Sequence, residues 1–128
     1  FNDQISLQIL TFFPLVVFHQ ISNSLCIRQI IPRGIDRVEI VWWYYGFLDD
    51  SDEIKNARLQ QINLVGPAGY ISMEDGAVGE FVQRNSKHSE GANGLIMMGG
   101  DGYESSSSRV TEAAIRGFWK QYYEMMDA

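Results

Sequence analysis

Alternating apolar and polar positions in the first third of the chain predict β-strands. Residues 5–13 alternate in part, and Pro14 then interrupts the ladder because proline has no backbone N–H to donate. Residues 25–31 alternate more cleanly, and residues 37–47 are rich in β-branched and aromatic side chains. The segment 32–36 between them has the proline, glycine and aspartate of a turn. Two adjacent strands with a short turn predict an antiparallel hairpin.

The hydrophobic period then changes to that of helices. An acidic cluster at residues 49–53 suits a helix N-terminus, and Asp50 and Glu53 have the spacing of a capping box. The GPAG segment at 66–69 predicts the end of that helix, or a kink in it. A second helix is expected at about residues 72–84.

The last third of the chain predicts a long loop followed by a helix. Residues 85–108 are rich in glycine and end in a run of serines. Residues 110–126 carry an apolar side chain at every fourth position, which predicts a helix that packs on a partner: Val110, Ala114, Phe118, Tyr122 and Met126. Strands that precede helices in this order indicate the α+β class with an antiparallel sheet.

Composition bounds the class of protein. The chain has 128 residues, 45% of them apolar and 20% charged, which indicates one globular domain or part of one and excludes disorder, collagen and coiled coil. A net charge of −6 argues against a nucleic-acid-binding surface. The single cysteine, Cys26, cannot form an internal disulfide or a cysteine-rich metal site, which fits a reducing, cytoplasmic environment.

The beginning of the sequence predicts a chain that starts inside a domain. Phe1 is not a start methionine, and the opening stretch lacks the basic residues of a signal peptide. The unbroken apolar run at 12–18 is far shorter than the roughly 20 residues of a membrane span. We therefore expect a fragment with further sequence upstream.

Glu74 and Asp75 are the strongest candidates for chemistry. On spacing alone, a helix cap is the favoured interpretation, in which Ser72 is the N-cap and Asp75, three residues later, is its reciprocal capping partner. The alternative is a metal site in which one carboxylate serves as a hard oxygen ligand. Consecutive helical residues point about 100° apart, so Glu74 and Asp75 would not both reach one ion.

The other candidate groups have structural interpretations that are favoured over functional ones. His19, expected at the end of an apolar strand, and His88, expected in a polar loop, are 69 positions apart and form no motif. Cys26 is expected to be a small buried side chain. The aromatic stripes at 42–47 and 118–123 are expected to be core, or the wall of a cavity for a flat apolar ligand.

Four stretches of the chain resemble one known family. They are ILTFFP at 9–14, QISNSLCIRQIIPRG at 20–34, ARLQQINLVGPAGYISMEDGAVGEFVQR at 57–84 and TEAAIRGFWKQYYEMM at 111–126. They resemble the C-terminal half of the catalytic domain of Rieske non-haem iron aromatic-ring-hydroxylating oxygenases, large subunit, in particular those that act on anthranilate and salicylate. The resemblance implies a helix-grip (START-like) fold, here incomplete, in which a curved antiparallel sheet wraps a long C-terminal helix at 110–126.

The resemblance also implies a site. The family's mononuclear iron is held by two histidines and one carboxylate, and the matching carboxylate here is Asp75. Phe13, Val65 and Ile71 match positions that line the substrate pocket. The histidine ligands and the Rieske 2Fe-2S cluster would lie outside this chain, since neither His19 nor His88 matches a ligand position.

Two departures from the family bear on the pocket. Leu15 follows the proline where a small polar residue is common, and His19 stands where glutamine is common.

The resulting hypothesis is part of a dioxygenase that hydroxylates a carboxylated aromatic ring. The intact enzyme would use O2 and electrons from NAD(P)H, delivered by a ferredoxin and reductase, and would form a trimer of large subunits with a small β subunit. The fragment alone would be inactive. The alternatives are a non-catalytic helix-grip domain that binds an apolar ligand, and a fragment that serves only subunit interaction.

Overall fold

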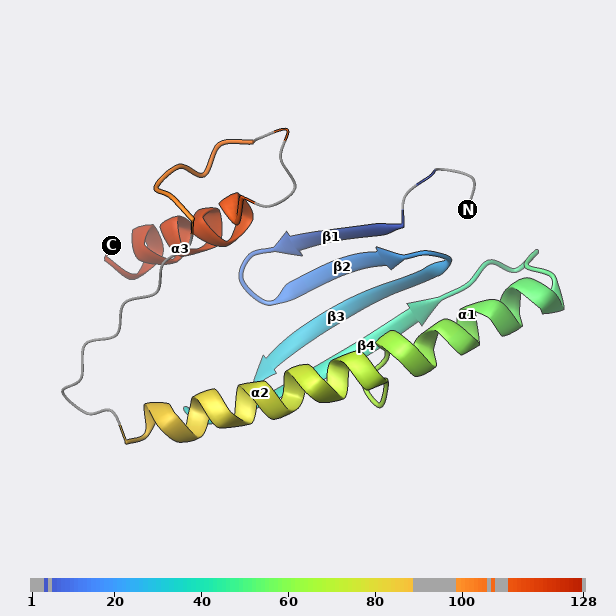
Figure 1. Cartoon of the computed structure of the whole chain (residues 1–128), viewed down its shortest axis with the longest axis horizontal. Helices are drawn as coiled ribbons and strands as arrows, with labels where there is room; N and C mark the ends of the chain where they lie inside the picture. Colours follow the sequence, from blue (N-terminus) through green and yellow to red (C-terminus); the bar gives the residue numbers. More distant parts are fainter. Residues whose placement is uncertain (1–3, 5, 89–98, 106, 108–110, 128) are drawn as a thin grey trace. The chain divides into compact units, whose positions relative to one another are not determined.

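The computed structural model describes residues 4, 6–88, 99–105, 107 and 111–127. The chain divides into two compact units, Phe1–Glu90 and Gly91–Ala128. Within the described residues, the first unit holds a four-stranded antiparallel sheet and two helices, and the second holds one helix (Figure 1). The elements are β1 (Leu7–Phe12), β2 (Val16–Ile21), β3 (Ser24–Pro32), β4 (Val38–Tyr45), α1 (Asp52–Val65), α2 (Tyr70–Ser86) and α3 (Ala113–Met126). The predicted α+β class is confirmed.

The register of the sheet sorts its side chains into two faces. The strands pair in chain order, and residues directly opposite each other project to the same side. His19 lies opposite Cys26, which lies opposite Tyr44. We call their side the helix-covered face, because the Tyr44 hydroxyl donates a hydrogen bond of 3.2 Å to the carbonyl oxygen of Val65 in α1. The other side is the open face.

The segment between β1 and β3 differs from the prediction. The sequence places His19 at the end of a strand, but it lies inside β2, which pairs with both β1 and β3. Pro14 sits in the short turn after β1, so the loss of its N–H ends one strand without ending the sheet. The predicted hairpin at 25–31 and 37–47 is confirmed as β3 and β4.

Helix α1 begins one residue later than the capping-box spacing predicts. Its N-cap is Ser51, whose side-chain oxygen accepts a 3.3 Å hydrogen bond from the Ile54 N–H. The predicted pairing of Asp50 with Glu53 is wrong, because the Asp50 carboxylate instead accepts from the Phe47 N–H at 2.9 Å and pairs with Arg58. Acidic residues do occupy the first turn, as expected.

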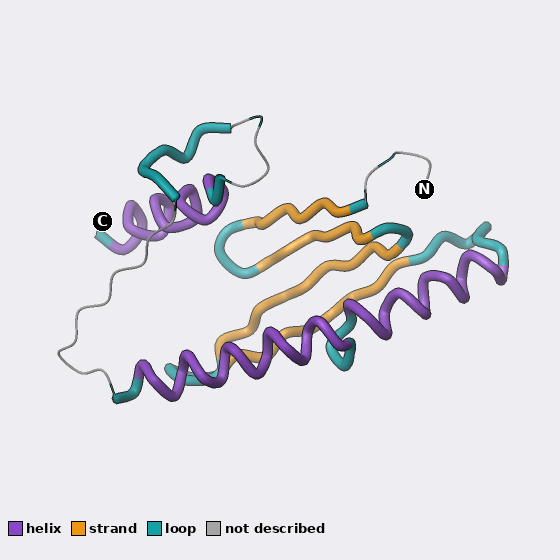
Figure 2. Tube along the Cα trace, in the orientation of Figure 1, coloured by secondary structure: helices purple, strands orange, loops and turns teal. Residues whose placement is uncertain are grey.

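Helix α2 follows α1 in nearly the same direction after a short loop (Figures 1 and 2). It begins at Tyr70 rather than near Ser72, because Gly69 is the last extended residue. Ser72 therefore lies inside the first turn and donates a 3.3 Å hydrogen bond to the Val65 carbonyl. The predicted capping pair of Ser72 and Asp75 is therefore wrong. The helix continues to Ser86.

The open face leaves large apolar side chains exposed within the described part of the first unit. Trp43 is 55% exposed and Phe12 is 56% exposed. On the helix-covered face, Trp42 and Tyr44 are half-buried. The expectation that the aromatic side chains of this strand form the core therefore holds for alternate residues only, because the strand's period of two sends its neighbours to the open face.

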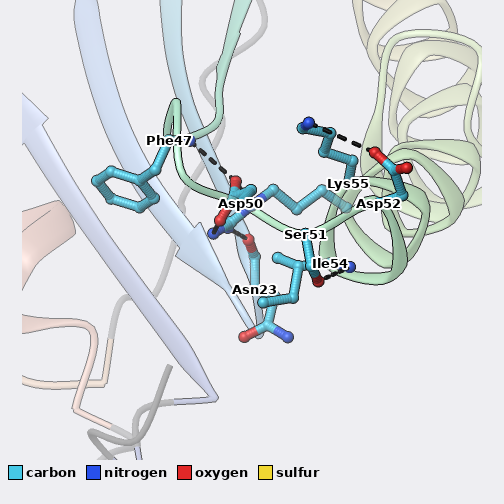
Figure 3. A network of polar contacts seen from close by, with 8 residues as sticks. Asn23, Phe47, Asp50, Ser51, Asp52, Ile54 and Lys55 are labelled. Carbon is cyan, nitrogen blue, oxygen red and sulfur yellow. Dashed lines mark hydrogen bonds and ion pairs between the residues drawn. The ribbon is translucent and has the colours of Figure 1, made fainter.

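Buried polar groups, rather than a large apolar core, connect α1 to the sheet. Cys26 and Val65 are the buried apolar side chains of the described residues, whereas Arg58 is 8% exposed. The Arg58 guanidinium donates to Asp50 at 2.9 Å through Nε, and also to the carbonyl oxygen of Asn23 in the β2–β3 turn. Figure 3 shows this network, in which Asp50 also receives the Phe47 N–H. The hydrogen bond from Arg58 holds the pKa of Asp50 below its usual value.

The second unit is organised around α3. The Arg116 side chain donates to the carbonyl oxygens of Gly102 and Thr111, and the Lys120 ammonium lies 3.9 Å from the centre of the Tyr103 ring. The helix spans most of the predicted 110–126, although Val110 lies outside the described residues. Trp119 packs edge-on against Tyr122, with ring centres 5.5 Å apart.

Arg58→Met should destabilise the protein because it leaves the buried Asp50 carboxylate without its cation. We expect the melting temperature to fall by about 5–10 °C. The matched control is Lys55→Met, which removes an exposed pair with Asp52 at 3.5 Å and should change the melting temperature by about 1 °C or less. Equal effects of the two substitutions, measured by calorimetry, would contradict the role of the buried pair.

Candidate functional site

A cavity of about 610 Å³ lies between the helix-covered face and α2. Arg28 and Trp42 line it from β3 and β4, and Asp36 lines it from the turn between those strands. Ser72 and Asp75 line it from α2. They share this side of the helix because residues three apart are neighbours on a helical surface. The cavity is therefore framed by a cation, an aromatic ring and carboxylates.

Asp75 presents an unpaired carboxylate to this cavity. No side chain in the described part of the chain forms a hydrogen bond or ion pair with it. Asp36, by contrast, accepts a 2.7 Å hydrogen bond from Lys87, which holds its pKa below the usual value. Glu74 lies about 100° further around α2 and is not among the residues that line the cavity. Of the two adjacent acids, Asp75 thus lines the cavity and Glu74 does not.

Arg28 and Trp42 form the floor of the cavity. They lie opposite each other on paired strands, and the guanidinium carbon of Arg28 is 5.1 Å from the centre of the Trp42 ring. The Trp42 ring is in turn stacked with Tyr44, with ring centres 6.3 Å apart. The Nε atom of Arg28 is buried and has no hydrogen-bond partner among the described residues. A buried donor without a partner favours an acceptor supplied by a ligand.

His19 and Cys26 lie next to this floor, on the helix-covered face, and are both buried. Burial, followed by the charge of Arg28, lowers the pKa of His19 to about 4. Burial likewise raises the pKa of the Cys26 thiol. Both side chains are therefore neutral near pH 7, and the expectation that Cys26 is a small buried group is confirmed. His19 is a buried group as well, since its Nε2 lacks a partner among the described residues.

The described residues supply one candidate carboxylate, Asp75, rather than a complete metal site. In that part of the chain, no three His, Cys, Asp or Glu side chains come together in a way that could hold a metal ion. His19 does not line the cavity beside Asp75, and His88 is exposed with its Nδ1 2.8 Å from the Arg84 carbonyl oxygen. Asp75 fits one position of an iron site because its oxygen atoms are unpaired and reach an open cavity.

The residues predicted to line the substrate pocket lie at different places. Val65 is buried where α1 meets the sheet, Ile71 is half-exposed in the first turn of α2, and Phe13 lies in the β1–β2 turn. The structure does not bring them together with Asp75 in one cavity, as judged from the described lining residues. Their role stays a prediction.

Arg28 was not identified as a site residue from the sequence, whereas Trp42 belongs to the aromatic stripe at 42–47 for which a cavity wall was the alternative to core. The signal for Arg28 was present, since the alternation of residues 25–31 places this arginine on the same face as Cys26. A cation within an otherwise apolar strand face indicates a partner or a ligand. The neighbouring position of Trp42 depends on the register of β3 with β4, which is a tertiary property.

Comparison with known proteins identifies the family. The family described as ring hydroxylating alpha subunit (catalytic domain) matches residues 2–128. The chain belongs to the ring-hydroxylating alpha subunit family. The predicted resemblance is therefore confirmed.

Three relatives support this membership of the ring-hydroxylating family. Terephthalate 1,2-dioxygenase terminal oxygenase component subunit alpha 2 of Comamonas sp is 51% identical over 98% of the chain and 30% of its own length. The anthranilate 1,2-dioxygenase large subunit of Burkholderia cepacia is 43% identical over 89% of the chain and 27% of its own length. The large oxygenase component of salicylate 5-hydroxylase from Ralstonia sp is 38% identical over 91% of the chain and 27% of its own length.

The chain spans less than a third of the length of these relatives, whose names denote oxygenases of aromatic carboxylates. Among the helices that the structure describes, none combines the length and the hydropathy needed to cross a membrane.

The depressed pKa of His19 predicts a specific dependence of stability on pH. Between the ordinary value of 6.5 and the folded value of about 4, the unfolded chain binds a proton that the folded chain does not. The contribution of His19 to the free energy of unfolding is therefore complete above pH 6.5 and is lost as the pH falls through about 4. We expect the free energy of unfolding, measured by urea denaturation, to fall less between pH 6.5 and about 4 in His19→Gln than in the unmodified protein. The exposed His88→Gln is the matched control, and a His19→Gln profile that parallels the unmodified one would contradict the assignment.

Proposed function

We propose that the chain is part of the large subunit of an aromatic-ring-hydroxylating dioxygenase and that Asp75 is the carboxylate ligand of its iron. Membership of the ring-hydroxylating alpha subunit family supports the reaction class. The observation that carries the assignment of Asp75 is its unpaired carboxylate at the wall of the cavity. Two histidine ligands and the Rieske 2Fe-2S cluster would come from residues outside this chain.

Iron held there would supply the activation of O2, with electrons that originate in NAD(P)H and arrive through a ferredoxin and reductase. The residues of this chain would hold and orient the reactants. Asp75 would supply one oxygen ligand to the iron. The Trp42 side chain at the floor would contribute apolar surface for an aromatic substrate.

Arg28 would select a carboxylated ring. Terephthalate, anthranilate and salicylate, named in the three relatives, all carry a carboxylate on an aromatic ring. A guanidinium binds a carboxylate through paired, charge-assisted hydrogen bonds. Arg28 has a buried Nε without a described partner and lies over Trp42, so one side chain could bind the carboxylate while the other contacts the ring.

The finer features of fold and assembly are also proposals. The chain would be an incomplete helix-grip domain, with Phe13, Val65 and Ile71 near the substrate in the intact protein. The large subunit would form a trimer with a small β subunit in the cytoplasm.

Asp75→Ala in the full-length protein should abolish iron retention and turnover, because two neutral histidines alone hold Fe(II) weakly. Iron content is measured by metal analysis after desalting, and product by chromatography. Glu74→Ala is the matched control, since Glu74 does not line the cavity, and it should retain most of the iron. If Asp75→Ala keeps its iron and its turnover, the carboxylate is not a ligand. If the unmodified full-length protein neither retains iron nor turns over a substrate, an apolar-ligand-binding domain without catalysis is the better interpretation.

Arg28→Met should raise KM for a carboxylated aromatic substrate by about 10–100-fold, because it removes a charge-assisted pair of hydrogen bonds. The effect should be much smaller for the corresponding carboxamide. Arg33→Met is the matched control, since Arg33 pairs with Glu39 at 2.6 Å on the exposed part of the sheet. An equal change in KM for both substrates would contradict carboxylate recognition by Arg28.

A further inference from the structure

The carbonyl oxygen of Val65 joins three elements of the first unit. It lies in the last turn of α1, where carbonyl groups have no partner within the helix. It accepts two hydrogen bonds, one of 3.2 Å from the Tyr44 hydroxyl on β4 and one of 3.3 Å from the Ser72 hydroxyl on α2. Burial raises the pKa of Tyr44, so its hydroxyl remains protonated and able to donate. A single acceptor thus connects the sheet to both helices.

The loop between the helices has little freedom to adjust. A Cβ atom on Gly66 would lie 2.5 Å from the Ile62 carbonyl oxygen, and one on Gly69 would lie 2.5 Å from that of Leu64. Such distances require glycine at both positions. The junction from Val65 to Gly69 is therefore tightly packed, and the direction of α2 depends on how this junction is anchored to the sheet.

Asp75 lies one helical turn beyond this anchor. Ser72 and Asp75 are three residues apart, line the same cavity and are separated by about 4.5 Å along the helix axis. A rotation or shift of the first turn of α2 would move the Asp75 carboxylate by a comparable amount. Metal ligands tolerate little displacement, because coordination fixes their distance and direction.

We infer that Tyr44 and Ser72 are positioning residues that fix the Asp75 carboxylate through their shared hydrogen bonds to the Val65 carbonyl. This inference rests on the proposed function, in which Asp75 is a metal ligand. Neither hydroxyl contacts the metal. Their contribution is to fix the axial position and the rotation of α2 relative to the sheet, so that the Asp75 side chain points into the cavity.

The test uses the full-length protein and Co(II) as a probe whose visible absorption reports coordination geometry. Tyr44→Phe and Ser72→Ala each remove one hydroxyl. We expect each to weaken Co(II) binding by about 10-fold and to change the shape of the absorption band, as for other residues that orient a metal ligand. Ser72→Thr keeps a hydroxyl and should restore both the affinity and the spectrum.

Two controls separate positioning from general loss of structure. Tyr45→Phe removes a hydroxyl from the adjacent residue on the open face, and Ser86→Ala removes one from the end of the same helix. Both should bind Co(II) normally. An unchanged affinity and spectrum in Tyr44→Phe and Ser72→Ala would overturn the inference, and so would a Ser72→Thr variant as weak as Ser72→Ala.

Asp75→Asn distinguishes this inference from the proposed function. If Asp75→Asn loses Co(II) binding while the two hydroxyl variants bind normally, only the positioning role fails. If Asp75→Asn binds Co(II) as tightly as the unmodified protein, the ligand assignment fails and the positioning role fails with it.

Discussion

The buried guanidinium of Arg58 is the interaction on which the arrangement of helix and sheet depends. It connects α1 to Asp50, which precedes the helix, and to the backbone of Asn23 between two strands. A buried cation requires acceptors of defined position, whereas apolar packing tolerates small sliding movements. Because few apolar side chains are buried among the described residues, such polar contacts determine where α1 lies on the sheet.

The unbroken antiparallel register then determines what the helices cover. Each pair of strands is in register along its length, so His19, Cys26 and Tyr44 form a row on the face that α1 contacts through Val65. Arg28 and Trp42 form the next such row and become the floor of the cavity. The cation and the aromatic ring of the site are thus cross-strand neighbours, and α2 contributes the Asp75 carboxylate from the opposite wall of the cavity.

Local patterns predicted the parts of the fold that depend on local rules. Alternation found the hairpin of β3 and β4, and glycine with proline found the break between α1 and α2. The strand β2 was not separated from its surroundings because the apolar run at 12–18 has no period. The cap of α1 was misassigned by one residue, since spacing cannot show that Arg58 engages Asp50.

The candidate site was predictable only in part, for the same reason. On spacing, Asp75 fitted a helix cap, and the family resemblance favoured a ligand. The cavity that it faces, with Arg28 and Trp42, arises from strand pairing and from the docking of α2. These are contacts between residues far apart in the sequence, and single-sequence periodicity carries no information about them.

The strand order has a consequence for how the first unit folds. Each strand pairs with its immediate successor through a short connection, so the sheet consists of local contacts that close small loops. The polar contacts that attach the helices span longer separations: 21 residues from Tyr44 to Val65, 35 from Asn23 to Arg58 and 51 from Asp36 to Lys87. We therefore expect hairpins to form before the helices dock, and a weakened docking contact to accelerate unfolding more than it slows folding. On this expectation, the geometry around Asp75 is completed last and is the first to be lost.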